Sequence, residues 1–256
     1  MYQGFYNLTS GMLTQSRNLN VISNNMVNIQ TAGYKRDKMV STTFQEEMLY
    51  RTGKRYKDNP EPMATTSKIR TADRTYVNYE QGSFDETEGI YDFALGENGF
   101  FCIDTPGGIR YTRNGSFNVD DEGYLNLNGM GRVEGRDGQP IRIDNEEFNV
   151  DGQGVIRSSQ VDETGAPVVL GALRVVDFAD YEALHKEDYG MFSTNQAAQE
   201  VEQPTVLWKM LERSNVDMVE EMTNMMSSQR ALQSAAQVLK MYDQVMSKAA
   251  SDVGRL

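Results

Sequence analysis

"NLNVISNNMVNIQTAGYKR", residues 18–36, combines a helix-like apolar repeat with a cluster of asparagines. Five asparagines fall within eleven positions of this stretch, although asparagine is a poor residue for a helix interior. The apolar repeat nevertheless continues through them, because Ile22, Met26 and Ile29 keep steps of four and three residues. We therefore predict a helix that runs to the end of the asparagine cluster and stops at Gly33, a suitable residue for a helix C-cap.

The same repeat extends back through the N-terminal segment. Eight positions between 5 and 29 alternate steps of three and four residues, and seven of them are apolar. This pattern is typical of the a/d seam of a coiled coil. We predict that residues 1–35 form the N-terminal helix of a helical core domain. The seam positions are Phe5, Leu8, Met12, Gln15, Leu19, Ile22, Met26 and Ile29.

A second long repeat occupies the C-terminal segment. We predict that residues 205–256 form a helix that pairs with the N-terminal one, with a second apolar line beside its seam that requires a further neighbour. The helix is rich in methionine, which adapts to irregular packing surfaces. Its seam is Leu211, Asn215, Met218, Met222, Met225, Gln229, Leu232, Ala236, Leu239, Asp243, Met246, Ala250 and Val253, and its second line is Val238, Tyr242, Val245 and Ala249.

The segment between the helices has the composition of an antiparallel β domain. Seventeen of the 22 glycines fall between residues 82 and 190, among short alternating runs, which indicates strands joined by turns. In "GIRYTRNGSFNV", Asn114-Gly115 predicts a tight hairpin. We predict a β domain at 76–190, a linker at 191–204, and an irregular basic connector at 36–75 with a short helix near 42–50. The fold class is therefore α+β.

The charge is unevenly distributed. The net charge of the chain is −12, which disfavours sequence-independent binding to nucleic acid because such binding needs a surplus of lysine and arginine. Residues 76–190 carry 23 acidic and eight basic residues, whereas residues 34–75 carry six acidic and ten basic ones. There is no apolar run long enough to span a bilayer, and the N-terminal residues lack the features of a secretory signal peptide. We expect neither membrane insertion nor a cleaved signal.

The residues offer little for catalysis or metal binding. Cys102 and His185 are the only cysteine and histidine, so the chain has too few soft ligands for a structural zinc site and no disulfide within itself. A Cys–His nucleophile pair is disfavoured. Weak calcium binding by acidic turns and a glycosidase-type carboxylate pair remain open alternatives. We predict no enzyme activity, cofactor or metal.

The amphipathic ends indicate a binding or structural role. Membrane-surface helices are usually rich in lysine and arginine on their polar face, and the N-terminal helix has only Arg17 before residue 34. Packing of helix on helix is therefore favoured. Apolar surface left over from the pairing indicates contacts with other copies, and contacts that do not close on themselves produce helical filaments. From the residues alone, a filament subunit and a coiled-coil stalk with a β head, as in an adhesin, remain equally open.

Three stretches resemble the bacterial flagellar rod and hook family. They are residues 10–36, "SGMLTQSRNLNVISNNMVNIQTAGYKR", residues 81–125, which include "YTRNGSF", and residues 211–246, which begin "LERSNVDMVEEM". The three occur in the family's order. The residues that carry the resemblance at the two ends are Asn24, Asn25, Asn28, Thr31, Gly33, Lys35, Glu212, Ser214, Asn215, Val216, Glu221, Met222, Gln229, Arg230 and Ala231.

The resemblance implies a rod subunit of the flagellar basal body. Members of the family build a tubular helical polymer that crosses the cell envelope and transmits motor torque to hook and filament. It implies assembly with copies of itself and with other rod or hook proteins. It also implies export through the flagellar type III apparatus without a cleaved signal. A hook-type axial subunit is the alternative within the family.

We expect the assembly contacts to lie on the two terminal helices. Asn24, Asn25 and Asn28 fall beside the seam, where their amides can bond neighbouring chains. A further expectation is that Lys54, Arg55 and Lys57 in the basic connector contact the acidic domain of an adjacent subunit. The predicted interface comprises Leu8, Met12, Leu19, Ile22, Asn24, Asn25, Met26, Asn28, Ile29, Leu211, Asn215, Met218, Met222, Met225, Gln229, Leu232, Leu239, Tyr242 and Met246.

Overall fold

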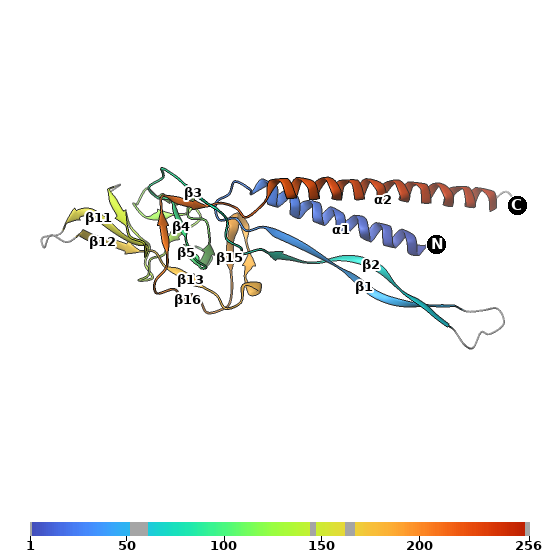
Figure 1. Ribbon diagram of the computed structural model, residues 1–256, viewed down its shortest axis with the longest axis horizontal. Coiled ribbons are helices and arrows are strands. Elements are labelled where there is room, and N and C mark those ends of the chain that lie inside the picture. Colours follow the sequence, from blue (N-terminus) through green and yellow to red (C-terminus); the bar gives the residue numbers. More distant parts are fainter. Residues whose placement is uncertain (1, 52–60, 144–146, 162–166, 254–256) are drawn as a thin grey trace. The chain divides into compact units, whose positions relative to one another are not determined.

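The computed structural model describes residues 2–51, 61–143, 147–161 and 167–253 (Figure 1). A long helix stands at each end of this part of the chain, and antiparallel strands lie between them, so the predicted α+β class is confirmed. The chain divides into two compact units. We call residues 1–27, 37–76 and 217–256 the helical unit, and residues 28–36 and 77–216 the β unit.

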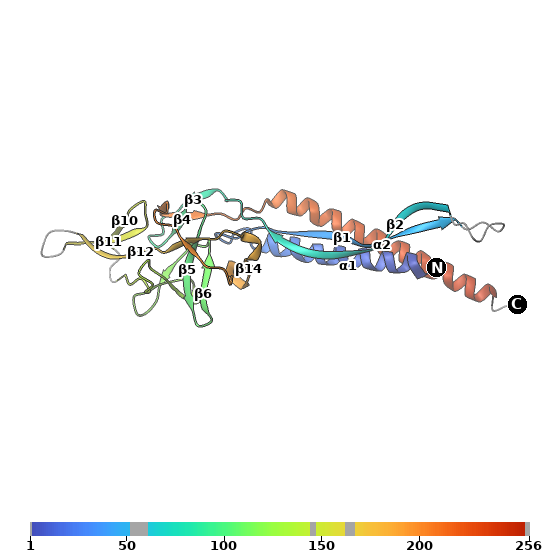
Figure 2. The ribbon, with the colours of Figure 1, turned by 90° about the horizontal axis from the view of Figure 1, so that it is seen from below.

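The helical unit contains α1 (Tyr2–Val27), α2 (Met218–Val253) and the strands β1 (Asp37–Arg51) and β2 (Glu61–Val77). The two helices lie side by side in both views (Figures 1 and 2). The Asn18 side-chain amide donates a hydrogen bond of 3.1 Å to the Ser228 hydroxyl across their contact. Strands β1 and β2 pair in a two-stranded sheet.

The boundaries of α1 differ from the prediction. The helix ends at Val27, and the asparagine-rich stretch continues as a turn in which Asn28 O accepts a bond of 3.1 Å from Thr31 N. Asparagine favours such turns because its side chain competes for nearby backbone groups. Gly33 has a positive φ of 66°, but it lies six residues beyond the helix and is therefore not its C-cap. A Cβ there would come within 2.2 Å of the Arg113 carbonyl carbon.

Helix α2 begins 13 residues later than predicted. The Asp217 carboxylate accepts bonds of 2.8 and 3.1 Å from Val219 N and Glu220 N, which is the arrangement of a helix N-cap. Two strands precede it, β17 (Val206–Trp208) and β18 (Met210–Glu212). Leu211 is therefore not helical, because β18 pairs with β3, and Asn215 lies between β18 and the helix cap.

The seam of α2 has the predicted period but a different phase. Met225, Leu232, Leu239 and Met246 are half-buried as expected, whereas Met218, Met222, Gln229, Ala236 and Asp243 are exposed. The alternate positions of the seam are held by residues one place earlier. Two of these, Glu221 and Ser228, are polar, so a search for apolar residues does not find them. The alternate seam residues are Glu221, Ser228, Ala235 and Tyr242.

The connector and linker are more regular than predicted. Residues 37–51 and 61–77 are strands, so the expected helix near 42–50 and the irregular connector at 36–75 are wrong. The stretch "MVSTTF", 39–44, contains the β-branched residues that favour a pleated strand over a helix. The expected linker at 191–204 contains β15 (Met191–Ser193) and β16 (Gln199–Glu200).

The described residues of the β unit form one large sheet and three small ones. The large sheet has the order β14-β15-β6-β5-β9-β8-β7, with β13 joining β5 and β16; the others are β10-β11-β12, β17-β4 and β18-β3. The remaining bounds are β3 Phe84–Glu86, β4 Phe93–Leu95, β5 Phe100–Thr105, β6 Gly108–Thr112, β7 Asn118–Val119, β8 Leu125–Asn126, β9 Arg132–Val133, β10 Phe148–Val150, β11 Val155–Val161, β12 Pro167–Ala172, β13 Val175–Asp177 and β14 His185–Lys186, with short 3-10 helices at Tyr181–Ala183 and Asp188–Gly190.

Strand β5 separates two cores. Phe101 and Ile103 belong to the larger core, whereas Phe100 and Cys102 belong to the smaller one. Successive side chains of a strand point to opposite faces, so a run of apolar residues indicates a strand covered on both sides. The run "GFFCI" at 99–103 therefore places β5 at the centre of the unit.

The predicted Asn114-Gly115 hairpin is wrong. Strand β6 pairs with β5 and β15, while β7 pairs with β8, so the two strands that flank this dipeptide do not form a hairpin with each other. The Asn114 carboxamide oxygen instead accepts a bond of 3.0 Å from Ser116 N. Gly115 is needed for close approach, since a Cβ there would lie 1.8 Å from Phe93 O.

Candidate assembly site

A buried ionic cluster lies where the N- and C-terminal segments of the β unit meet. Glu212, in β18, has its Oε1 2.6 Å from Lys35 Nζ and its Oε2 3.3 Å from Arg113 Nη1, and the three side chains are at most 4% exposed. The Gly82 amide donates a further bond of 3.0 Å to Oε1, and Lys35 Nζ donates one of 2.8 Å to Glu80 O. We call Lys35, Arg113 and Glu212 the Glu212 cluster.

Burial controls the electrostatics of this cluster. It lowers the pKa of Lys35 and of Arg113, and the opposing attraction of Glu212 is the smaller effect for both. Two cations share one carboxylate, so removal of the carboxylate would leave two buried charges without their counterion. An uncompensated buried charge is strongly destabilising, by about 3–5 kcal/mol. The cluster therefore makes the fold of the β unit depend on the two terminal segments.

Backbone hydrogen bonds join the same segments. Gly33 N donates to Glu212 O at 2.7 Å. The Asn215 side chain accepts from Arg36 N at 2.7 Å and donates to the carbonyl oxygens of Asn78 and Glu80 at 2.8 and 2.9 Å. Asn215 was predicted to be a helix-seam residue. Its observed role is to link backbone from two other segments of the β unit.

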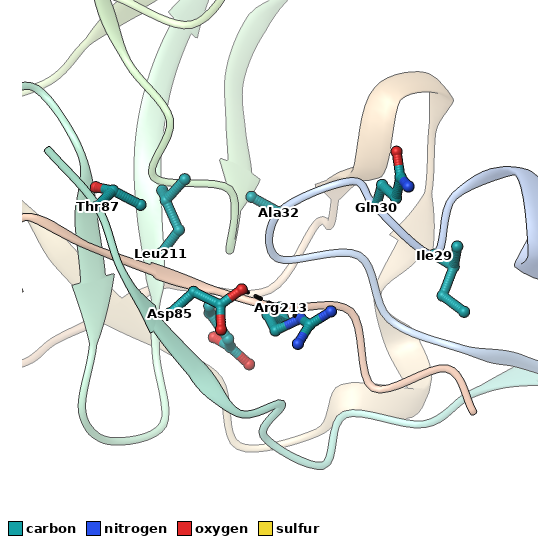
Figure 3. Close-up of a pocket in the computed structure, with 8 residues that line it drawn as sticks. Ile29, Gln30, Ala32, Asp85, Thr87, Leu211 and Arg213 are labelled. Carbon is teal, nitrogen blue, oxygen red and sulfur yellow. Dashed lines mark ion pairs between the residues drawn. The ribbon is translucent and has the colours of Figure 1, made fainter. Parts of the chain in front are cut away.

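A pocket of about 230 Å³ lies beside Glu212 (Figure 3). Ile29 and Leu211, both predicted interface residues, line it, so the structure brings these two positions to one site. Two further lining residues form an ion pair: Asp85 Oδ2 lies 3.3 Å from Arg213 Nε, and both side chains are more than half exposed. We call it the Ile29–Leu211 pocket. Its other lining residues are Gln30, Ala32, Thr87 and Glu212.

The remaining predicted interface residues lie in the helical unit, apart from Asn28 in the turn that follows α1. Asn25 is buried, and its amide exchanges hydrogen bonds of 2.8 and 2.9 Å with the backbone of Asp37. It therefore fixes the start of β1, and its predicted contact with another chain stays a prediction. The exposed positions are Asn24, Met218, Met222 and Gln229; the buried or half-buried ones are Leu8, Met12, Leu19, Ile22, Met26, Asn28, Met225, Leu232, Leu239, Tyr242 and Met246.

Comparison with known proteins finds family matches over both terminal segments that contribute to this site. Three family models match in order along the chain: "Flagella basal body rod protein" at residues 5–35, "Flagellar hook protein FlgE/F/G D1 domain" at 94–166, and "Flagellar basal body rod FlgEFG protein C-terminal" at 209–252. The flagellar basal-body rod protein FlgF of Caulobacter vibrioides is 31% identical, over 96% of this chain and 95% of its own. The chain belongs to the flagellar basal-body rod protein family.

Other relatives in this rod protein family match with similar coverage. The flagellar hook-basal body complex protein FlhO of Bacillus subtilis is 28% identical over the whole of both chains. The rod protein FlgG of Buchnera aphidicola is 29% identical, over 93% of this chain and 95% of its own. These names describe parts of the flagellum and not enzymes. Lys35 and Glu212 lie in the two terminal family matches, as do Ile29 and Leu211 of the pocket.

Outside the pocket, the described residues offer few groups for catalysis or metal binding. Burial raises the pKa of the Cys102 thiol to about 12, so it is not a nucleophile at neutral pH. Two strands separate β5 from the strand that holds His185, which corresponds to about 14 Å at the usual strand spacing. Among the described residues, no group of three His, Cys, Asp or Glu is arranged to hold a metal ion. No described helix is long and apolar enough to cross a membrane.

Lys35, Arg113 and Glu212 stand in the three stretches that resemble the family, but the sequence predicts no contact among them. The available signal was weak: Lys35 and Arg36 are the first charged residues after Arg17, and Glu212 stands beside Arg213 at the end of a mostly apolar run. Nothing in the order of residues pairs positions that are 177 apart. The cluster therefore required the structure.

Proposed function

We propose that this chain is a structural subunit of the flagellar basal-body rod. It assembles with copies of itself and with other rod or hook proteins into a tubular helical polymer that crosses the cell envelope and transmits motor torque. The observation that carries the proposal is family membership over nearly the whole chain, including both terminal helices. Transport before assembly, in this proposal, uses the flagellar type III export apparatus without cleavage of a signal. The proposal includes no binding to nucleic acid and no insertion into a membrane.

The helices of the helical unit support assembly through their exposed apolar side chains. Each helix packs against the other, yet among the residues whose burial is described, seven large apolar residues of α2 and three of α1 remain exposed. Contiguous apolar surface exposed on a protein usually marks an interface. We propose that α1 and α2 pair as a coiled coil and that these residues contact neighbouring subunits. The residues are Tyr6, Leu13, Val27, Met218, Val219, Met222, Met226, Val238, Met241 and Val245.

The β unit carries a large net negative charge, whereas the helical unit is close to neutral. The β unit carries 26 acidic and 12 basic residues, whereas the helical unit carries 11 and 13. We propose that the β units face outward in the polymer, where like charge opposes uncontrolled lateral association. The proposed contact of Lys54, Arg55 and Lys57 with an acidic neighbour lies outside the described residues. Their joint reversal to Glu would leave polymerisation unchanged if that contact does not exist.

Purified full-length chain tests the proposal. Light scattering is measured against concentration for the unsubstituted chain and for a Leu13→Lys, Val245→Lys double variant. Both positions are exposed, so the fold should persist while assembly is lost. Val169→Lys is the matched control, because Val169 is an exposed valine on β12 of the β unit. Equal assembly of all three proteins would contradict a helix-mediated polymer, and a discrete trimer would support a coiled-coil stalk instead.

A further inference from the structure

We propose that the Ile29–Leu211 pocket binds a methionine side chain from a second copy of this chain, supplied by Met222 or its neighbours one turn away, Met218 and Met226. This inference rests on the proposed function and names one contact of the polymer. It assigns the pocket a partner, and it assigns a role to the exposed methionine line of α2.

The pocket has the size and chemistry for one side chain. Its volume of about 230 Å³ lies below the roughly 300–1,000 Å³ of small-molecule sites. Ile29, Ala32 and Leu211 form the apolar part of its lining, and the oppositely charged Asp85 and Arg213, which also line it, pair with each other. An uncharged occupant therefore enters without leaving a charge unpaired.

The walls of the pocket are fixed before any partner binds. The turn containing Ala32 is held by the bond from the next residue, Gly33 N, to Glu212 O. Strand β18, which contains Leu211, pairs with β3 in a register that sets Leu211 opposite Asp85. Arg213 N also donates a bond of 2.8 Å to Ser83 O. A pocket already shaped in the free chain avoids the ordering free energy that a flexible surface would lose on binding.

The methionine line of α2 has matching properties. Met218, Met222 and Met226 follow one another at steps of four residues, which places them on one side of a helix. They are 48%, 41% and 50% exposed, and the half-buried seam toward α1 uses other positions. Methionine is unbranched and flexible, so it can enter a narrow, irregular cavity. The apolar lining residues Ile29, Ala32 and Leu211 and the three methionines fall in the terminal segments matched by the rod-family models.

Cross-linking between two preparations tests the contact. One full-length chain carries Ala32→Cys and a mass tag, and the other carries Met222→Cys without a tag. After co-assembly, a short bismaleimide can join them only between copies, because each chain contains one introduced thiol. Native Cys102 is buried with its pKa raised to about 12, so it contributes little background at neutral pH. Val169→Cys replaces Ala32→Cys in the control pair.

The expected result is a heterodimer of mixed mass, at a yield well above that of the Val169→Cys pair. Met218→Cys and Met226→Cys are tested in parallel. If the chains assemble but none of the three methionine positions exceeds the control, the inference is wrong while the proposed function stands. If the unsubstituted chain does not assemble, the proposed function fails and this inference fails with it.

Filling the pocket from within gives a second test. Ala32→Leu places its own side chain in the cavity, and Ala32→Ser is the control of similar size. We expect Ala32→Leu to raise the concentration needed for assembly about tenfold, which corresponds to about 1.4 kcal/mol. Assembly of Ala32→Leu at the concentration of the unsubstituted chain would contradict the inference.

Discussion

Replacement of Glu212 by Gln is the perturbation with the largest expected effect on the β unit. The substitution keeps the size of the side chain but leaves Lys35 and Arg113 buried without a carboxylate. Loss of one partner from a buried ion pair destabilises by about 3–5 kcal/mol. Since 1 kcal/mol shifts the midpoint of a 150–250-residue protein by about 2–4 °C, the expected fall in Tm is about 6–20 °C.

Near-ultraviolet circular dichroism of Trp208 measures this loss. It is the only tryptophan, and its indole N–H donates a bond of 2.8 Å to Ile90 O within the β unit, so its signal reports that unit. Arg213→Gln is the matched control, because its ion pair with Asp85 is exposed and should contribute at most about 1 kcal/mol. A Tm for Glu212→Gln within about 2 °C of that of the unsubstituted chain, well short of the expected fall of about 6–20 °C, would refute the reasoning.

A triple variant separates the ion pair from the shape of the site. Apolar replacements of similar size in a buried ionic group are often neutral or stabilising. Lys35→Met, Arg113→Met, Glu212→Leu should therefore recover much of the stability that Glu212→Gln loses. A triple variant less stable than Glu212→Gln would show that hydrogen bonds to the cluster, and not charge compensation, dominate.

Three further predictions concern single positions. Asn25→Ala removes both bonds to the Asp37 backbone and should lower the free energy of unfolding by about 1–3 kcal/mol in a denaturant titration. Gly33→Ala should unfold at a lower denaturant concentration, because Gly33 has a positive φ and a Cβ there would meet the Arg113 backbone. Gly11→Ala, in open space on α1, should gain about 0.5–1 kcal/mol of unfolding free energy. A Gly33→Ala chain more stable than the Gly11→Ala chain would contradict this. Cys102→Ala should make the loss of stability with rising pH less steep. Folding raises the pKa of the Cys102 thiol from 9.0 to about 12. The stability that the neutral thiol contributes is therefore complete below pH 9 and is lost as pH rises toward 12, by up to about 1.4 kcal/mol per pH unit.

The sequence predicted the type and order of the main elements better than their boundaries. The three- and four-residue repeat identified both terminal helices, since it persists over many turns. It could not locate their ends, because the same spacing continues by chance through Ile29 and backward to Leu211, where turn and strand pairing determine the backbone. A local cap at Asp217 outweighed the apolar pattern.

The candidate site was only partly predictable. Ile29 and Leu211 were predicted to be seam residues, and both instead line one pocket of the β unit. An Asn-Gly dipeptide is typical of a hairpin turn, yet Gly115 is needed because Phe93 O approaches it closely. Such contacts join distant residues, so they depend on tertiary packing that local pattern does not encode.

Electron microscopy of the concentrated, unsubstituted full-length chain tests the central claim most directly. The rod-subunit account predicts tubular assemblies with a single helical repeat, formed above a threshold concentration and absent from the Leu13→Lys, Val245→Lys variant. A chain that stays monomeric, or that stops at a discrete trimer at every concentration, would contradict it.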